Sequence, residues 1–154
     1  MLRFAMESTH QRNVFNFKSY AKNQMEITEL RREDEKAWDS YVYNSNKSTF
    51  YHQIGWRNVV EKTYNHKPLY LIAKENGEIK GVLPLFLMKS IIFDEKKLVS
   101  VPFAPYGGVC ADSETVKNAL IEKAKRIISE LDMGDKVNNN ESIYYQLCEN
   151  ENGA

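Results

Sequence analysis

A β-hairpin between residues 69 and 89 is the feature of this sequence that most limits how the chain can fold. Two apolar segments, Leu69–Lys74 and Ile79–Lys89, flank the dipeptide Asn76–Gly77. Asparagine and glycine both tolerate the positive φ angles of a tight turn, so this spacing predicts two adjacent antiparallel strands. Gly81 and Pro84 interrupt the second arm. Because proline cannot donate to a β-ladder, they predict a bulge or a splay there.

Three amphipathic helices are predicted around this hairpin. The first follows Asp34, which we expect to cap it, and the second begins near Gln53 and ends at Asn65. The third spans Ser113–Leu131, with Gly134 ending it. Their apolar faces repeat at helical spacing and comprise Ala37, Trp38, Tyr41 and Val42; Ile54, Trp56, Val59, Val60 and Tyr64; and Val116, Leu120, Ile121, Ala124, Ile127, Ile128 and Leu131.

Further short strands are predicted at Met25–Leu30, Leu98–Val101 and Ser142–Glu149. The order of elements is then β α α β β β α β. Strands mixed with segregated helices indicate an α+β fold, in which helices flank a mixed β-sheet.

The chain of 154 residues suits one domain, which we expect to span residues 25–149. Residues 1–24 lack the continuous apolar segment of a secretory signal, so we expect a loosely ordered leader, with Met25 as an alternative start. Residues 150–154 are expected to fray. The longest apolar segment, Val82–Met88, is far shorter than a membrane span, and a cytoplasmic protein is expected.

Charge and cysteine content narrow the class of protein further. Lys and Arg number 21 and Asp and Glu number 21, and this balance argues against a DNA-binding protein. Three histidines and two cysteines, scattered along the chain, predict no metal site. Cys110 and Cys148 form no CxxC motif, so a disulfide between them is possible but nothing requires it.

The segment Leu98–Cys110, LVSVPFAPYGGVC, is the strongest candidate for a binding loop. Tyr106, Gly107 and Gly108 follow two prolines, and glycines let a ligand approach the backbone. Two interpretations stay open, a tight turn alone and a turn that lines a site.

His52 and Trp56 lie about one helical turn apart and are further candidates for substrate binding. Trp56 could equally belong to the core. Cys110 could pair with His52 or His66 as a nucleophile, or could be a small buried thiol.

Three lysines and one serine close to the end of the hairpin form a third candidate group. They could contact phosphates of a nucleotide-linked ligand, or could simply be a solvated turn. This group comprises Lys89, Ser90, Lys96 and Lys97.

Four segments, in this order, carry a resemblance to a known family: AWDSYV, STFYHQIGW, HKPLYLIAKENGEIKGVLPLFLMKS and LVSVPFAPYGGVCAD. From about Met25 to Leu131 the chain resembles the N-terminal half of FemAB-like proteins, which are GNAT-related acyltransferases. The resemblance implies a GNAT-like mixed sheet flanked by helices. It also implies transfer of an acetyl or aminoacyl group to an amine of a cell-wall or polysaccharide precursor. The donor would be acetyl-CoA or aminoacyl-tRNA, with no cofactor bound tightly.

The sequence departs from this family in two respects. The Q/RxxGxG/A turn that binds pyrophosphate in ordinary GNAT enzymes is missing, and the second GNAT-like domain of the family has no counterpart here. The resemblance therefore implies a partner, either a second GNAT-like half or another copy of this chain, beside a small-molecule or glycan-precursor acceptor. A non-catalytic acceptor-binding or assembly module is the alternative. No catalytic residue is identified, although Glu61 and His52 are conceivable general bases.

Overall fold

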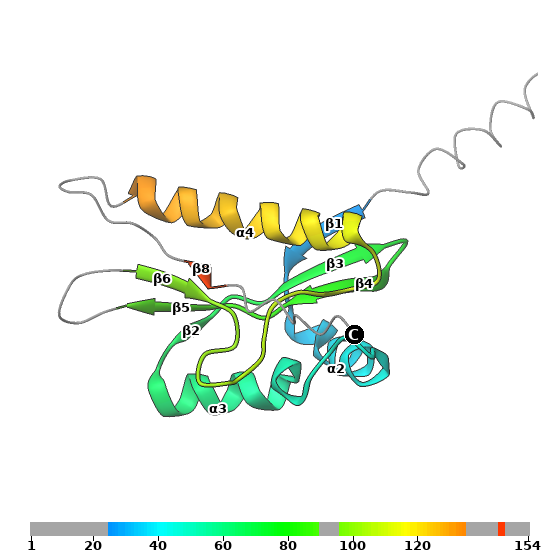
Figure 1. Ribbon diagram of the computed structural model, residues 1–154, viewed down its shortest axis with the longest axis horizontal. Coiled ribbons are helices and arrows are strands. Elements are labelled where there is room, and N and C mark those ends of the chain that lie inside the picture. Colours follow the sequence, from blue (N-terminus) through cyan, green and yellow to red (C-terminus); the bar gives the residue numbers. More distant parts are fainter. Residues whose placement is uncertain (1–24, 90–95, 135–144, 147–154) are drawn as a thin grey trace, which may run out of the picture.

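The predicted hairpin lies at the centre of the fold in the computed structural model, which describes residues 25–89, 96–134 and 145–146 (Figure 1). Strand β3 (Leu71–Glu75) pairs antiparallel with β4 (Glu78–Leu83). The turn residues Asn76 and Gly77 have φ angles of 53° and 82°, as the sequence predicts.

Within the described residues, two four-stranded sheets share this hairpin. The first has the order β1-β3-β4-β7, with β1 (Met25–Glu29) and β7 (Cys110–Ala111) at its edges. The second has the order β2-β5-β6-β8 and comprises Lys67–Pro68, Phe86–Lys89, Lys96–Val99 and Tyr145–Gln146. Strands β6 and β8 are parallel and the other pairs are antiparallel. The predicted α+β class with mixed strand directions is therefore confirmed.

The second arm of the hairpin contains both irregularities that the sequence predicts. The register shifts between Ala73 and Lys74, so that Lys80 forms a bulge opposite them. The arm then breaks at Pro84 and resumes as β5. Backbone pairing continues across the break, because the Leu69 N–H donates to the Leu85 carbonyl at 2.8 Å.

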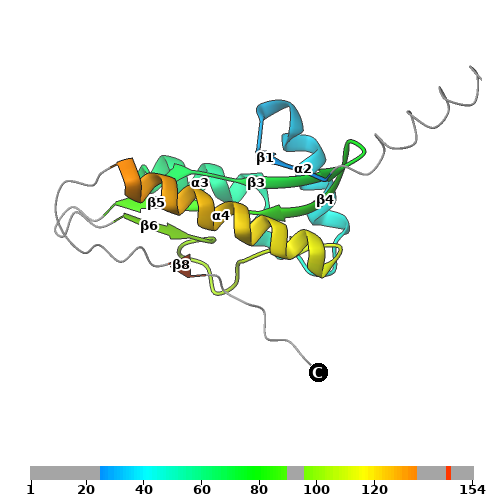
Figure 2. The ribbon, with the colours of Figure 1, turned by 90° about the horizontal axis from the view of Figure 1, so that it is seen from above.

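In the described part of the chain, three α-helices cover the two faces of the sheets. They are α2 (Glu35–Asn44), α3 (Ile54–Tyr64) and α4 (Glu114–Gly134), and single 3₁₀ turns at Arg32–Asp34 and Phe50–His52 precede the first two. In Figures 1 and 2, α4 lies over one face while α2 and α3 lie under the other. The fold thus has three layers, with helices on both sides of the strands.

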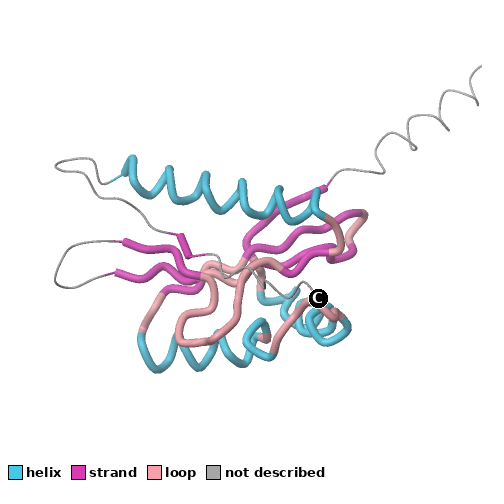
Figure 3. Tube along the Cα trace, in the orientation of Figure 1, coloured by secondary structure: helices cyan, strands magenta, loops and turns pink. Residues whose placement is uncertain are grey.

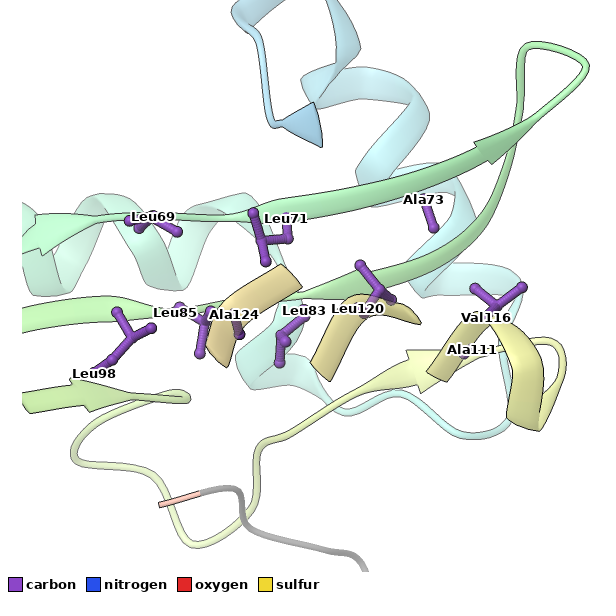
Figure 4. Packing of buried hydrophobic residues seen from close by; sticks show 10 residues of the cluster. All are labelled: Leu69, Leu71, Ala73, Leu83, Leu85, Leu98, Ala111, Val116, Leu120 and Ala124. Atoms are coloured by element: carbon purple, nitrogen blue, oxygen red, sulfur yellow. The ribbon is translucent and has the colours of Figure 1, made fainter. Parts of the chain in front are cut away.

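Alternation along the strands produces a separate core on each face. Leu69, Leu71 and Ala73 face α4, whereas Tyr70 and Ile72 face α2 and α3. Figure 4 shows the α4-side cluster, which adds Leu83, Leu85, Leu98, Ala111, Val116, Leu120 and Ala124. The opposite cluster contains Trp38, Val42, Ile54, Val60, Val82, Phe86 and Cys110.

The structure differs from the predicted elements mainly at their ends. Asp34 does not cap α2 with its side chain and instead pairs with Lys74, Oδ1 to Nζ 2.7 Å. Strand β6 begins at Lys96, ahead of the predicted start, and α4 continues to Gly134. The predicted leader 1–24, the tail 150–154 and Cys148 lie outside the described residues. Among the residues that the structure describes, no helix is long and apolar enough to cross a membrane.

Candidate functional site

The loop of residues 100–109 spans the gap between β6 and β7, which both pair with the second arm of the hairpin (Figure 3). Ser100 lies in this gap and is 1% exposed. Its Oγ donates to the Pro84 carbonyl at 2.8 Å and accepts from the Gly108 N–H at 2.8 Å. The hydroxyl therefore joins both ends of the loop to the break in the hairpin, in place of ladder hydrogen bonds.

His52 fastens the far end of the loop to the turn that precedes α3. Its Nδ1 accepts from the Thr49 N–H at 3.1 Å, so the ring proton lies on Nε2, which donates to the Gly108 carbonyl at 3.2 Å. The His52 carbonyl accepts from Trp38 Nε1 at 2.7 Å. Burial lowers the pKa of His52, so the ring stays neutral.

This geometry gives His52 a positioning role in the loop. Both of its ring nitrogens are already bonded, which leaves none to accept a proton from a substrate. Its contribution to a site would be to hold Gly108, because the Ser100 and His52 side chains bind the two polar groups of that one residue.

Gly107 and Gly108 are both required by the packing of the loop. Gly108 has a φ of 102°, which other residues rarely adopt. A Cβ on Gly107 would lie 2.9 Å from the Cβ of Val101 and 3.0 Å from the Ser100 carbonyl. Tyr106, beside them, is 54% exposed. Of the three predicted loop residues, only the tyrosine therefore presents a side chain to a ligand.

The tip of the loop reaches α3 through an exposed aromatic cluster, formed by Tyr64, His66 and Phe103. The Phe103 ring stacks on Tyr64 with centroids 4.2 Å apart and lies 6.0 Å from His66 in a nearly parallel plane. Phe103 and Val101 have positive φ angles of 64° and 50°, which are unusual for these residue types. Strained backbone of this kind often occurs at functional sites.

Trp56 lies on α3 and packs against Tyr51 in an edge-to-face arrangement, with centroids 5.0 Å apart. Its indole Nε1 is buried and has no hydrogen-bond partner among the described residues. The structure thus brings His52, Gly107, Gly108 and Tyr106 together through one loop, whereas Trp56 contacts Tyr51 and packs against the core cluster that contains Trp38.

The other candidate reactive groups do not form a catalytic arrangement. Cys110 is fully buried, its Sγ lies 3.1 Å from Ser45 Oγ, and burial raises the pKa of the thiol. Lys89 lies opposite Lys96 in the β5–β6 pair, and Ser90 is outside the described residues. Within the described ranges, no group of three acidic, His or Cys side chains could hold a metal ion.

The turn that enters α4 carries two acidic residues, Asp112 and Glu114, on either side of Ser113. Negative charge at a helix start disfavours the binding of phosphate there, although Glu114 also pairs with Lys117, Oε2 to Nζ 3.7 Å. Ser113 Oγ also accepts from the Val116 N–H at 3.3 Å, which occupies one of the free amides.

Two parts of this site are not predictable from local sequence patterns. Ser100 resembles an ordinary serine within a short apolar strand. Its only signal is that a polar residue stands where a buried apolar residue is expected. The aromatic cluster joins Tyr64 and His66 to a residue far along the chain, so it depends on how the loop folds back.

Comparisons with known proteins give structural likenesses only. No family model matches the chain, and no curated protein matches it. Among solved structures, a GNAT family acetyltransferase from Brucella melitensis in complex with acetyl-CoA is 17% identical, covers 70% of each chain and has a TM-score of 0.44. A possible acetyltransferase from Clostridium difficile 630 is 16% identical over 83% of this chain and 82% of its own, with a TM-score of 0.46.

A GNAT family acetyltransferase from Staphylococcus aureus is 11% identical over 80% of this chain and 98% of its own, with a TM-score of 0.47. These identities and TM-scores are low. The fold class stated above therefore rests on the sheet order and the helix layers of this chain itself.

Proposed function

We propose that this chain is the acceptor-binding domain of an N-acyltransferase, in which the loop of residues 100–109 contacts the acceptor. The observation that carries the proposal is the double attachment of Gly108, whose N–H bonds Ser100 and whose carbonyl bonds His52. A loop fixed in this way presents Tyr106 in one position, and such preorganisation favours ligand binding. The acceptor would be an amine of a cell-wall or polysaccharide precursor, as the family resemblance implies.

In an acyl transfer the acceptor amine loses a proton and attacks the carbonyl of the donor, and the resulting oxyanion needs hydrogen-bond donors. Neither His52 nor Cys110 is placed as the general base, because His52 has both ring nitrogens bonded and Cys110 is buried. The acidic start of α4 does not favour the phosphates of CoA. We therefore assign the donor, acetyl-CoA or aminoacyl-tRNA, to a second GNAT-like half in the cytoplasm.

A transfer assay tests this proposal. The chain is incubated with radiolabelled acetyl-CoA or aminoacyl-tRNA and an amine-bearing cell-wall precursor, with and without a separately expressed second half. We expect transfer only with both halves present. The Tyr106→Ala variant should raise the KM for the acceptor more than it lowers kcat. Transfer by the isolated chain, or equal kinetics for Tyr106→Ala, would contradict this division of roles.

A non-catalytic binding module is the second candidate, and it is favoured because neither His52 nor Cys110 is placed as a general base. It predicts that the chain binds the precursor, measured by calorimetry, and that the second half adds no turnover. Tyr106→Ala should then weaken binding in the same way.

A further inference from the structure

A pocket of about 780 Å³, separate from the loop of residues 100–109, lies between α2 and the turn that joins β3 to β4. One wall is a face of α2 together with Ser45 and Asn46, which follow that helix. The others are residues 77–79, at the start of β4, and Asp112, which follows β7. The polar side chains among them are Ser40, Tyr41, Asn44, Ser45, Asn46, Glu78 and Asp112. None of these belongs to the loop of residues 100–109.

Helix α2 turns two different faces to its surroundings. Trp38 and Val42 are buried in the core, whereas Ala37 is exposed and Tyr41 is only half-buried. The sequence predicted all four on one apolar face. Ala37 is exposed instead, whereas Tyr41 packs against the edge of the core that contains Trp38 and Val42, and its hydroxyl reaches the pocket. Together with Ser40 and Asn44 they form a stripe at helical spacing that lines the pocket.

The base of the pocket is fixed at the Lys80 bulge. The Tyr41 hydroxyl donates to Asp112 Oδ1 at 2.8 Å and lies 3.1 Å from the Lys80 carbonyl. The Asp112 N–H donates to the same carbonyl at 2.9 Å. Because Tyr41 donates to one oxygen of Asp112, the carboxylate is held in one orientation and keeps its second oxygen as an acceptor.

Oxygen acceptors dominate the rest of the lining. Asn44 gives an amide hydrogen to the Ser40 carbonyl at 2.8 Å, which leaves its side-chain oxygen as an acceptor. The C-terminal end of α2, where the helix dipole is negative, also lies at this pocket. The nearby cations have partners, since Lys47 donates to the Ala111 carbonyl and Lys80 pairs with Glu78.

We propose that this pocket binds a small cationic ligand rich in hydrogen-bond donors, namely an amine that also carries hydroxyl groups, as an amino sugar does. The ammonium group would lie against Asp112 and the end of α2, and the hydroxyl groups would meet Ser40, Asn44 and Asn46. The pocket uses none of the residues of the loop site, so this proposal stands or falls separately from the acyltransferase proposal.

The test is an NMR titration of the ¹⁵N-labelled chain with glucosamine, at a slightly acidic pH where its amine is protonated, and with glucose as the neutral comparison. We expect saturable shifts of the Gly77 amide and of the Asn44 and Asn46 side-chain amides. For such an open site the Kd should be on the order of 1 mM and should rise with salt. Glucose should bind roughly tenfold more weakly, because it lacks the charge. No saturable shift, or equal affinity for both sugars, would overturn the proposal.

Variants locate the interaction. Asp112→Asn keeps an acceptor for Tyr41 but removes the charge, and should weaken glucosamine binding about three- to tenfold while changing glucose binding little. Asn46→Ala, on an exposed loop, should weaken both sugars and remains informative if Asp112→Asn proves unstable. Glu130→Gln, which removes an exposed carboxylate from α4, is the matched control and should bind like the wild type. A similar loss of affinity in Glu130→Gln and Asp112→Asn would show that the pocket is not the binding site.

Discussion

Replacing Ser100 by alanine tests whether one hydroxyl holds the loop of residues 100–109 in place. The change removes a donor to the Pro84 carbonyl and an acceptor for the Gly108 N–H, both at 2.8 Å and both buried. Alanine fits the space, so the cost comes from two backbone groups left without partners. Each such group costs about 1–3 kcal/mol, so we expect the free energy of unfolding to fall by about 2–6 kcal/mol.

Urea denaturation followed by circular dichroism measures this loss. Small proteins lose roughly 1–3 kcal/mol of stability per molar urea, so at about 2 kcal/mol per molar the midpoint should fall by about 1–3 M. Ser113→Ala is the matched control, because Ser113 caps α4 at its exposed start and its loss should cost only about 1 kcal/mol. Hydrogen exchange of the Gly108 amide should also accelerate. If Ser100→Ala costs no more than Ser113→Ala and leaves this exchange rate unchanged, Ser100 does not hold the loop.

Substitutions at three further positions test other features of the fold. Gly81→Ala should lower the thermal midpoint. The added Cβ would lie 2.6 Å from Val116 Cγ1 and push α4 away, at a cost of about 1–3 kcal/mol. An unchanged midpoint would contradict this packing. Phe103→Ala should lower the free energy of unfolding by about 1 kcal/mol, because the stack on Tyr64 is lost. Phe103→Gly should lower it less, because glycine accepts a φ of 64°. Equal losses of stability for the two variants would mean that this backbone is not strained. Burial lowers the pKa of His52 in the folded state, so the unfolded chain binds more protons as the solution becomes acidic. The contribution of the neutral His52 ring to stability is therefore present above its ordinary pKa of 6.5 and is lost as the pH falls below that value. His52→Gln should therefore flatten the decrease of stability with acid in denaturation series at several pH values, and an unchanged slope would contradict a neutral buried ring.

The sequence predicted the hairpin well because its signals are local. Asn76 and Gly77 act through their own φ angles, and the alternation from Leu69 to Ala73 depends only on the geometry of one strand. The irregularities at Lys80 and Pro84 were likewise visible from glycine and proline within the strand. Element ends were less accurate, as with Asp34, whose side chain pairs with Lys74 on a distant strand and does not cap its own helix.

The candidate sites were harder to predict because their partners are far apart along the chain. Ser100 and Pro84 meet only when β6 pairs with β5, and His52 meets Gly108 only when the loop folds back over the sheet. The pocket beside α2 depends on the Tyr41 hydroxyl reaching Asp112, a contact that no local pattern contains. In both places the residue types were visible in the sequence, but their geometry arises from the tertiary fold.

The hairpin that passes through both sheets has a consequence for how the molecule unfolds. Its arms supply the central strands of the first sheet and also pair within the second, and the Leu69–Leu85 hydrogen bond joins the two regions. Neither sheet can then lose its register alone, because a slip by one residue would move Leu71 and Ile72 to the wrong faces at once and disrupt both cores. The two sheets therefore behave as a single cooperative unit, in which the slowest-exchanging amides belong to β3 and β4 and report the global free energy of unfolding.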